Sequence, residues 1–174
     1  MEERPSIRQA TLRPEGTMTV LAESQAPPIR TEVLHFSSTA GTQFWDLTEV
    51  VREVLARAGV QHGQVTVYSP HTTTSVVINE SESGFVNDFR RLITMVVPQD
   101  DYYEHDDLEI RTENLQEDEY RNGHAHCRQL LVGATSATIP VVEGELLIGP
   151  YQRVLFLELD QARERRVVIH AQGI

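Results

Sequence analysis

The chain is poor in cysteine, in long apolar runs and in positive charge, and each shortage excludes a class of protein. The single cysteine, Cys127, rules out an internal disulfide framework and suits a reducing compartment. We expect it to be buried as a small apolar side chain. No apolar run approaches the roughly 20 residues that a membrane-spanning helix needs, and the first 20 residues contain no apolar segment typical of a signal peptide. We therefore expect a cytoplasmic protein without a membrane partner.

Acidic residues dominate the charge. The formal net charge is −11, which disfavours nucleic acid as a partner because a phosphate backbone is itself negative. Residues 100–119 alone carry ten acidic side chains and one arginine. This segment predicts a solvated loop, since clustered carboxylates repel one another. The alternative is a lid or cation-attracting rim beside His105.

Length and periodicity predict one α+β domain. The 174 residues suit a single core, with a flexible tail over 1–29 and a folded domain over 30–174. Apolar residues at 3–4 spacing predict a helix that follows Asp46, a second whose apolar stripe is Phe85, Phe89, Leu92, Ile93 and Val96, and a third over 120–132. Strands are predicted over 31–37, 64–69, 72–79, 136–142, 145–148, 153–159 and 165–171. The result is a largely antiparallel sheet with about three helices on one side; the alternative is α/β.

Three histidines stand out from the seven. His71, His105 and His126 come from three different elements, and polar groups such as Glu104, Asp106 and Asn122 flank them. Imidazole is the commonest metal ligand and titrates near neutral pH. The three rings therefore predict a metal site or an acid–base site, although no HExxH or CxxC motif supports a shared ion.

Short motifs recur in a fixed order along the chain: His71-Thr72-Thr73, Asn79-Glu80, Asp88, Pro98, Tyr103-Glu104-His105, Asn122 with His126, Gly133, Gly144-x-Leu-Leu-x-Gly149, Gln152, Glu158 and Arg163-x-Arg165. In this order they resemble the YjbQ-like family over about residues 31–173. The resemblance implies an α+β fold, a homotrimer and a metal site on His71, His105 and His126. Three neutral nitrogens leave a tetrahedral ion with an open position, so we expect a divalent metal, most simply zinc. Family members are described as secondary thiamine-phosphate synthases or as uncharacterised.

The chain departs from the family pattern in three places. The usual Gly-x-Trp-Gln is Gly149-Pro-Tyr151-Gln152, which keeps an aromatic ring but changes its hydrogen-bonding end. The usual Asp-Gly-Pro-Arg is Asp160-Gln-Ala-Arg163, so the turn loses its glycine and proline. The loop between His105 and Asn122 is also longer. These changes affect substrate identity more than fold.

Strand length places part of the site between subunits. His71 and Asn79 would lie about 26 Å apart in a regular strand, whereas a metal and its ligands span only about 4–5 Å. The two ends can share a site only if the strand folds back or if symmetry brings two copies together. With the family's trimer in mind, we expect a site at a subunit interface.

The remaining candidate residues receive roles in binding or proton transfer. Glu80 and Asp88 are the candidate general bases. Arg163 suits an anionic group because its planar fork matches carboxylate or phosphate. The full set of predicted substrate contacts is Asn79, Asn122, Gln152, Arg163 and Arg165. We expect weak thiamine-phosphate synthase activity on small anionic molecules; the alternatives are a non-catalytic trimer that binds a metal or small anion, and a structural trimer.

Overall fold

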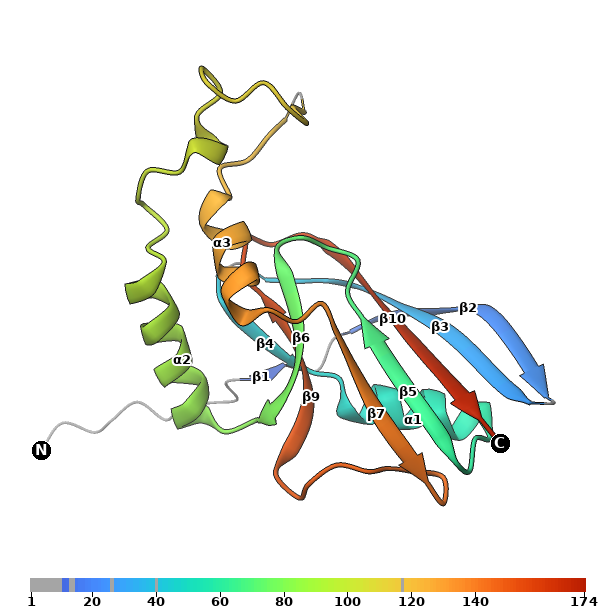
Figure 1. Ribbon diagram of the computed structural model, residues 1–174. Helices are drawn as coiled ribbons and strands as arrows, with labels where there is room; N and C mark the ends of the chain where they lie inside the picture. Colours follow the sequence, from blue (N-terminus) through green and yellow to red (C-terminus); the bar gives the residue numbers. More distant parts are fainter. Residues whose placement is uncertain (1–10, 13–14, 26, 40, 117) are drawn as a thin grey trace, which may run out of the picture.

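Two β-sheets pack against each other in the computed structural model, which describes residues 11–12, 15–25, 27–39, 41–116 and 118–174 (Figure 1). The four-stranded sheet has the order β1 (Thr11–Leu12), β4 (Gln43–Asp46), β9 (Gln152–Glu158) and β6 (Thr74–Glu80). Its β1–β4 pair is parallel, and its other pairs are antiparallel.

The second sheet has six strands and is antiparallel throughout. Its order is β2 (Gly16–Gln25), β3 (Pro28–Ser37), β10 (Glu164–Gly173), β5 (Gly63–Tyr68), β7 (Ser136–Val142) and β8 (Glu145–Leu146). Burial alternates along β10, with Val167, Ile169 and Ala171 facing the core. This period of two is what a sheet with one buried face requires.

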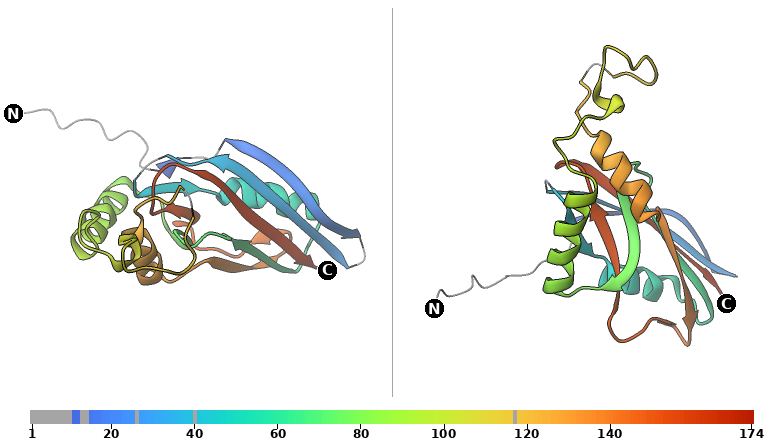
Figure 2. Two further views of the ribbon diagram at one scale, coloured as in Figure 1. Left: turned by 90° about the horizontal axis from the view of Figure 1, so that it is seen from above. Right: turned by 60° about the vertical axis from the view of Figure 1, so that its left-hand side comes forward.

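The three helices lie on two different faces. Helix α1 (Thr48–Ala58) packs with the six-stranded sheet in the main core, and Gly59 ends it at φ +72°. Helices α2 (Ser83–Val96) and α3 (Gly123–Val132) cover the outer face of the four-stranded sheet (Figure 2). A second core lies there. It consists of Phe44, Val86 and three leucines, of which Leu155 and Leu157 belong to β9 and Leu159 follows it. The prediction that all helices lie on one side is therefore wrong, because β9 is apolar on both faces and so needs a cover on each.

A long segment stands out from the body between α2 and α3 (Figures 1 and 2). We call residues 97–122 the arm. It contains the 3-10 turn η1 (Glu104–Asp106) and includes the acidic segment 100–119. Arg111 holds the arm together, since its guanidinium donates to the carbonyls of His105, Glu113 and Asn114 and pairs with Glu119.

Other sequence predictions meet mixed outcomes. The α+β class is confirmed, and β7 matches its predicted bounds. The tail predicted over 1–29 is instead structured where it is described: β1, β2 and the start of β3 fall within it, while residues 1–10 lie outside the described residues. Cys127 is exposed rather than buried. Among the described residues, no helix is long and apolar enough to cross a membrane.

Candidate functional site

His105 and His126 lie against each other where the arm joins α3. Their ring centroids are 4.5 Å apart. One carboxylate fixes this arrangement: Asp106 in η1 accepts from the backbone N–H groups of Asn122 and Gly123, both at 2.9 Å. A carboxylate at a helix N-terminus also complements the helix dipole. Gly123 is required there, because a Cβ would lie 2.6 Å from the Cβ of Tyr103.

A chain of hydrogen bonds determines which nitrogen of His105 carries its proton. Asn122 Nδ2 donates to Asp160 Oδ2 at 3.2 Å, which orients the amide because a carboxylate only accepts. Asn122 Oδ1 then faces His105 Nε2 at 3.1 Å, so Nε2 must be the donor. In the neutral ring, Nδ1 of His105 is left with a lone pair. Burial, and after it repulsion from His105, lower the pKa of His126, which favours the neutral form of the His126 ring.

Asp160 connects the histidine pair to Arg163. Arg163 Nε donates to Asp160 Oδ2 at 2.9 Å, and its guanidinium lies 4.9 Å from the centre of the Tyr120 ring. No other described residue hydrogen-bonds its two terminal nitrogens. Arg163 is therefore positioned by Asp160 and Tyr120 and retains donors for an anionic ligand.

Arg165 has a different position from Arg163. Its guanidinium is buried and donates twice to Glu158 at 2.6 Å and once to Thr73 at 3.1 Å. Glu158 also accepts from Ser38 Oγ at 2.6 Å and from the Asp160 backbone N–H at 3.1 Å. This buried group joins β9 to β10 and fixes the turn that presents Asp160 and Arg163. It engages Nε and one terminal nitrogen of Arg165 and leaves the side chain only 5% exposed.

His71 lies in the turn before β6. Its Nε2 accepts the backbone N–H of Arg166 at 3.1 Å, so Nδ1 carries the proton of the neutral ring. Burial, reinforced by the charges of Arg165 and Arg166, lowers its pKa to about 4. The ring is therefore neutral at physiological pH. Metal binding through Nε2 would require the bond to Arg166 to break, whereas Nδ1–H can donate to an anion as it stands.

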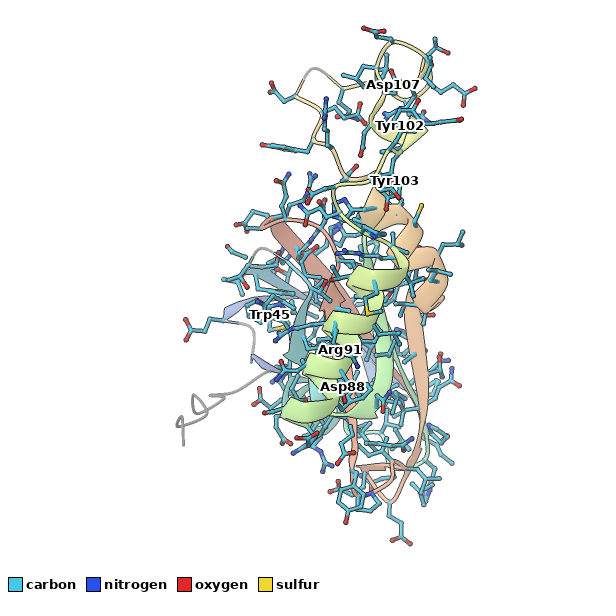
Figure 3. All side chains as sticks on the ribbon, turned by 90° about the vertical axis from the view of Figure 1, so that its left-hand side faces the viewer. Trp45, Asp88, Arg91, Tyr102, Tyr103 and Asp107 are labelled. Carbon is cyan, nitrogen blue, oxygen red and sulfur yellow. The ribbon has the colours of Figure 1, made fainter. Side chains whose placement is uncertain are left out.

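The other predicted residues lie elsewhere on the chain. Asn79 and Glu80 end β6 and are exposed, opposite Arg153 and Gln152 of β9. Gln152 accepts from the Gly149 N–H at 2.7 Å. Asp88 lies on the flank of α2 beside Arg91, and Tyr103 lies beyond the end of that helix (Figure 3). The four predicted residues of this group do not contact the histidine pair within one chain: Asn79, Glu80, Asp88 and Gln152.

The donor set of one chain is incomplete for a metal. Among the described residues, no group of three or more His, Cys, Asp or Glu side chains is placed to hold an ion. Two rings bound to one zinc ion would lie about 5 Å apart, given bonds of about 2.1 Å. The 4.5 Å separation of His105 and His126 fits two ligands, and further ligands would have to come from a second copy, a substrate or water.

Sequence reasoning missed the central role of Asp160, which joins Asn122 to Arg163. The only signal was its place in the altered Asp160-Gln-Ala-Arg163 turn. An open cavity of about 1050 Å³ adjoins His105 and runs between the two limbs of the arm. His105, Tyr102, Tyr103 and Tyr120 line it together with acidic side chains. Fold and site together define a two-sheet α+β domain with a histidine–carboxylate–arginine site at one end.

Comparison with known proteins identifies the family. A family model described as "UPF0047 protein YjbQ-like" matches residues 32–174. A UPF0047 protein of Archaeoglobus fulgidus is 38% identical over 126 residues, which cover 72% of this chain and 88% of that protein. The UPF0047 protein YugU of Bacillus subtilis is 31% identical over 143 residues, 82% of this chain and 98% of that protein. The chain belongs to the YjbQ-like family.

Solved structures agree with this assignment. A hypothetical protein of Aeropyrum pernix matches with a TM-score of 0.68 and 32% identity, covering 82% of this chain and 98% of that one. A YjbQ/UPF0047 protein of Clostridium acetobutylicum, described as uncharacterised, matches with a TM-score of 0.65 and 28% identity, covering 78% and 96%. These matches extend over nearly the whole of each relative.

Proposed function

We propose that the protein is a homotrimer that binds a divalent metal, most simply zinc, through His105 and His126 and holds a small anionic substrate beside it. The observation that carries this proposal is the hydrogen-bonded chain from Arg163 through Asp160 and Asn122 to His105. Through these bonds the Asp160 carboxylate orients both the Nδ1 lone pair of His105 and the guanidinium of Arg163.

The two ends of this series of hydrogen bonds, Arg163 and His105, have complementary chemistry. Arg163 and the Nδ1–H of His71 suit the oxygens of a phosphate or carboxylate, and the charges of Arg165 and Arg166 favour an anion near His71. A bound zinc ion would supply Lewis acidity toward a phosphate oxygen. Coupling of a pyrimidine pyrophosphate to a thiazole phosphate, with release of pyrophosphate, needs this kind of charge neutralisation. It is the first reaction to test.

Exposed apolar residues support self-association. Among the residues that the structure describes, ten of the sixteen exposed large hydrophobic side chains fall within residues 92–131, on α2, the arm and α3. Leu92 and Val96, which the sequence places on the apolar stripe of α2, are 55% and 59% exposed in the single chain. Such a concentration is typical of an interface. A neighbouring copy there would also be close enough to the arm to complete the ligand set around His105.

The test measures zinc binding and turnover separately. We expect His105→Ala and His126→Ala to lose tight zinc binding in titrations of chelator-stripped protein, with unchanged circular dichroism. His35→Ala is the matched control, since His35 is an exposed histidine on β3. Equal zinc affinity in all three variants would refute the proposed site.

Turnover separates catalysis from simple binding. We expect wild-type protein with zinc to form thiamine phosphate slowly and Arg163→Gln to lose that rate. The sequence contains no glycine-rich phosphate cradle, which favours the second candidate, a non-catalytic trimer that binds a metal and a small anion. Zinc-dependent binding of phosphate or pyrophosphate without product formation would select that second function.

A further inference from the structure

The N-terminal segment lies outside the family match, yet it belongs to both sheets. The match begins at residue 32, so β1, β2 and the first residues of β3 precede it. Strand β1 pairs with β4 at the edge of one sheet, and β2 pairs with β3 at the edge of the other. The segment therefore covers strand edges that the matched domain alone would leave open.

Backbone pairing, more than side-chain packing, holds β2 in place. Its register with β3 runs from Gly16 opposite Phe36 to Gln25 opposite Pro28, with an irregularity between Val20 and Ala22. Among the β2 side chains that the structure describes, Met18 is the one that is partly buried against the core. The strand is thus bound mainly through a ladder that any identical strand could form.

Gly16 shows how closely this strand approaches its neighbour. A Cβ at that position would lie 1.7 Å from the carbonyl oxygen of His35. The sequence is therefore adapted to docking on β3.

The sequence of the connection opposes the closed hairpin. Only Ala26 and Pro27 separate Gln25 from its partner Pro28. Two-residue hairpin turns favour Asn-Gly, Asp-Gly or a first-position glycine, because they need positive φ. Proline fixes φ near −65° and has no N–H. A short hinge of unfavourable sequence next to a well-matched strand is the arrangement that invites exchange between copies.

We propose that the β3 edge is a strand-binding surface and that its partner is the N-terminal strand of a second copy of this chain. When the connection between β2 and β3 opens, β1 and β2 leave their own sheets and form the same pairs on a neighbour. The ladder and the Met18 contact are regained in full, while the turn is released. This exchange is independent of the proposed zinc site.

A pair of cysteines can report which copy β2 occupies. Thr17 and His35 are exposed register partners, and directly opposite antiparallel residues have Cα atoms about 4.5–5.5 Å apart, within disulfide range. In a Cys127→Ser background, Thr17→Cys/His35→Cys protein is incubated at low and high concentration and then oxidised. A non-reducing denaturing gel separates intrachain from interchain disulfides.

We expect interchain dimers whose fraction rises with concentration, and a several-fold lower fraction when Ala26→Asn/Pro27→Gly supplies a favourable turn. Met18→Ala is the matched control and should leave the fraction unchanged, because closed and exchanged forms share that contact. Intrachain disulfides alone, or no disulfide, would overturn the proposal. So would dimers that form equally in the hinge variant or in either single-cysteine protein, since these would reflect random collision.

Discussion

The buried position of His71 predicts a specific dependence of stability on pH. Its pKa is about 4 in the folded protein, against the ordinary value of 6.5 for a histidine. Between these values, the unfolded chain takes up a proton that the folded chain does not. The contribution of the neutral His71 ring to the free energy of unfolding is therefore fully present above pH 6.5 and is lost as the pH falls toward 4.

The size of this contribution follows from the shift. A difference of about 2.5 pKa units corresponds to about 3 kcal/mol at pH 4. Solvent around the half-buried ring screens this interaction, which reduces the expected value to about 2 kcal/mol. Over the steep part of the range, the free energy of unfolding should fall by about 1 kcal/mol for each pH unit.

The assay compares wild-type protein with His71→Gln in urea at a series of pH values. Glutamine can still accept from the Arg166 N–H, but it does not titrate. The difference between the two unfolding free energies therefore isolates His71 from the carboxylates that titrate in the same range. Arg166→Gln is a second comparison: it removes one of the charges that lower the His71 pKa, and it should raise that pKa only modestly because burial is the larger cause.

Two results would refute this reasoning. One is a difference curve that stays flat from pH 7 to pH 4.5. The other is an NMR titration in which His71 protonates at pH 6.5 or above in the folded protein. Either would mean that solvent reaches the ring and that its bond to Arg166 does not persist in solution.

Three further substitutions test the framework of the site. Arg165→Met should destabilise the protein by about 3–5 kcal/mol in thermal or urea unfolding, because it leaves Glu158 buried without its partner; Arg165→Met/Glu158→Leu should recover much of that loss. Asp160→Asn should weaken zinc binding by about 10–100-fold while the fold persists, since it disturbs the group that orients Asn122 and through it His105. Gly133→Ala should cost about 1 kcal/mol in unfolding free energy, because Gly133 ends α3 at φ +82°.

Periodicity predicted the elements that bury one face. The helix after Asp46, the second helix and the β7 strand all have apolar residues at the spacing of their structure, and each is found close to its predicted place. The strands β2 and β4 escaped prediction for physical reasons. Strand β4 has only four residues, and β2 exposes most of its described side chains, so neither produces a clear alternation.

The candidate site was predictable only in part. Two of the three selected histidines, His105 and His126, do meet. The role of Asp160 was hidden because Asn122, 38 residues upstream, reaches it only through the tertiary fold, although Arg163 is a local partner three residues downstream. Nothing local distinguished Arg163, which retains free donors, from the buried Arg165. Their difference depends on which face of the chain turns toward the core.

A mixing experiment can determine whether the site spans two copies. Asn79 and Glu80 lie at one end of β6, and His71 lies before the other end, so a site that uses both ends needs two chains. If His105 of one copy and Glu80 of its neighbour serve one site, neither His105→Ala nor Glu80→Ala protein alone has an intact site. Trimers reassembled from equal amounts of both variants would regain about one site in four, because each site then draws its two residues at random from adjacent copies.

Calorimetric titration with zinc counts the tight sites in these mixed trimers. We expect Glu80→Ala to lose tight zinc binding, because Glu80 is predicted to orient a ligand or substrate at the site. A mixture of His105→Ala with His126→Ala is the matched control. These two residues lie together in one chain, so that mixture should regain none. Recovery in the control, or none in the His105–Glu80 mixture, would contradict an interfacial site that combines His105 of one copy with Glu80 of its neighbour.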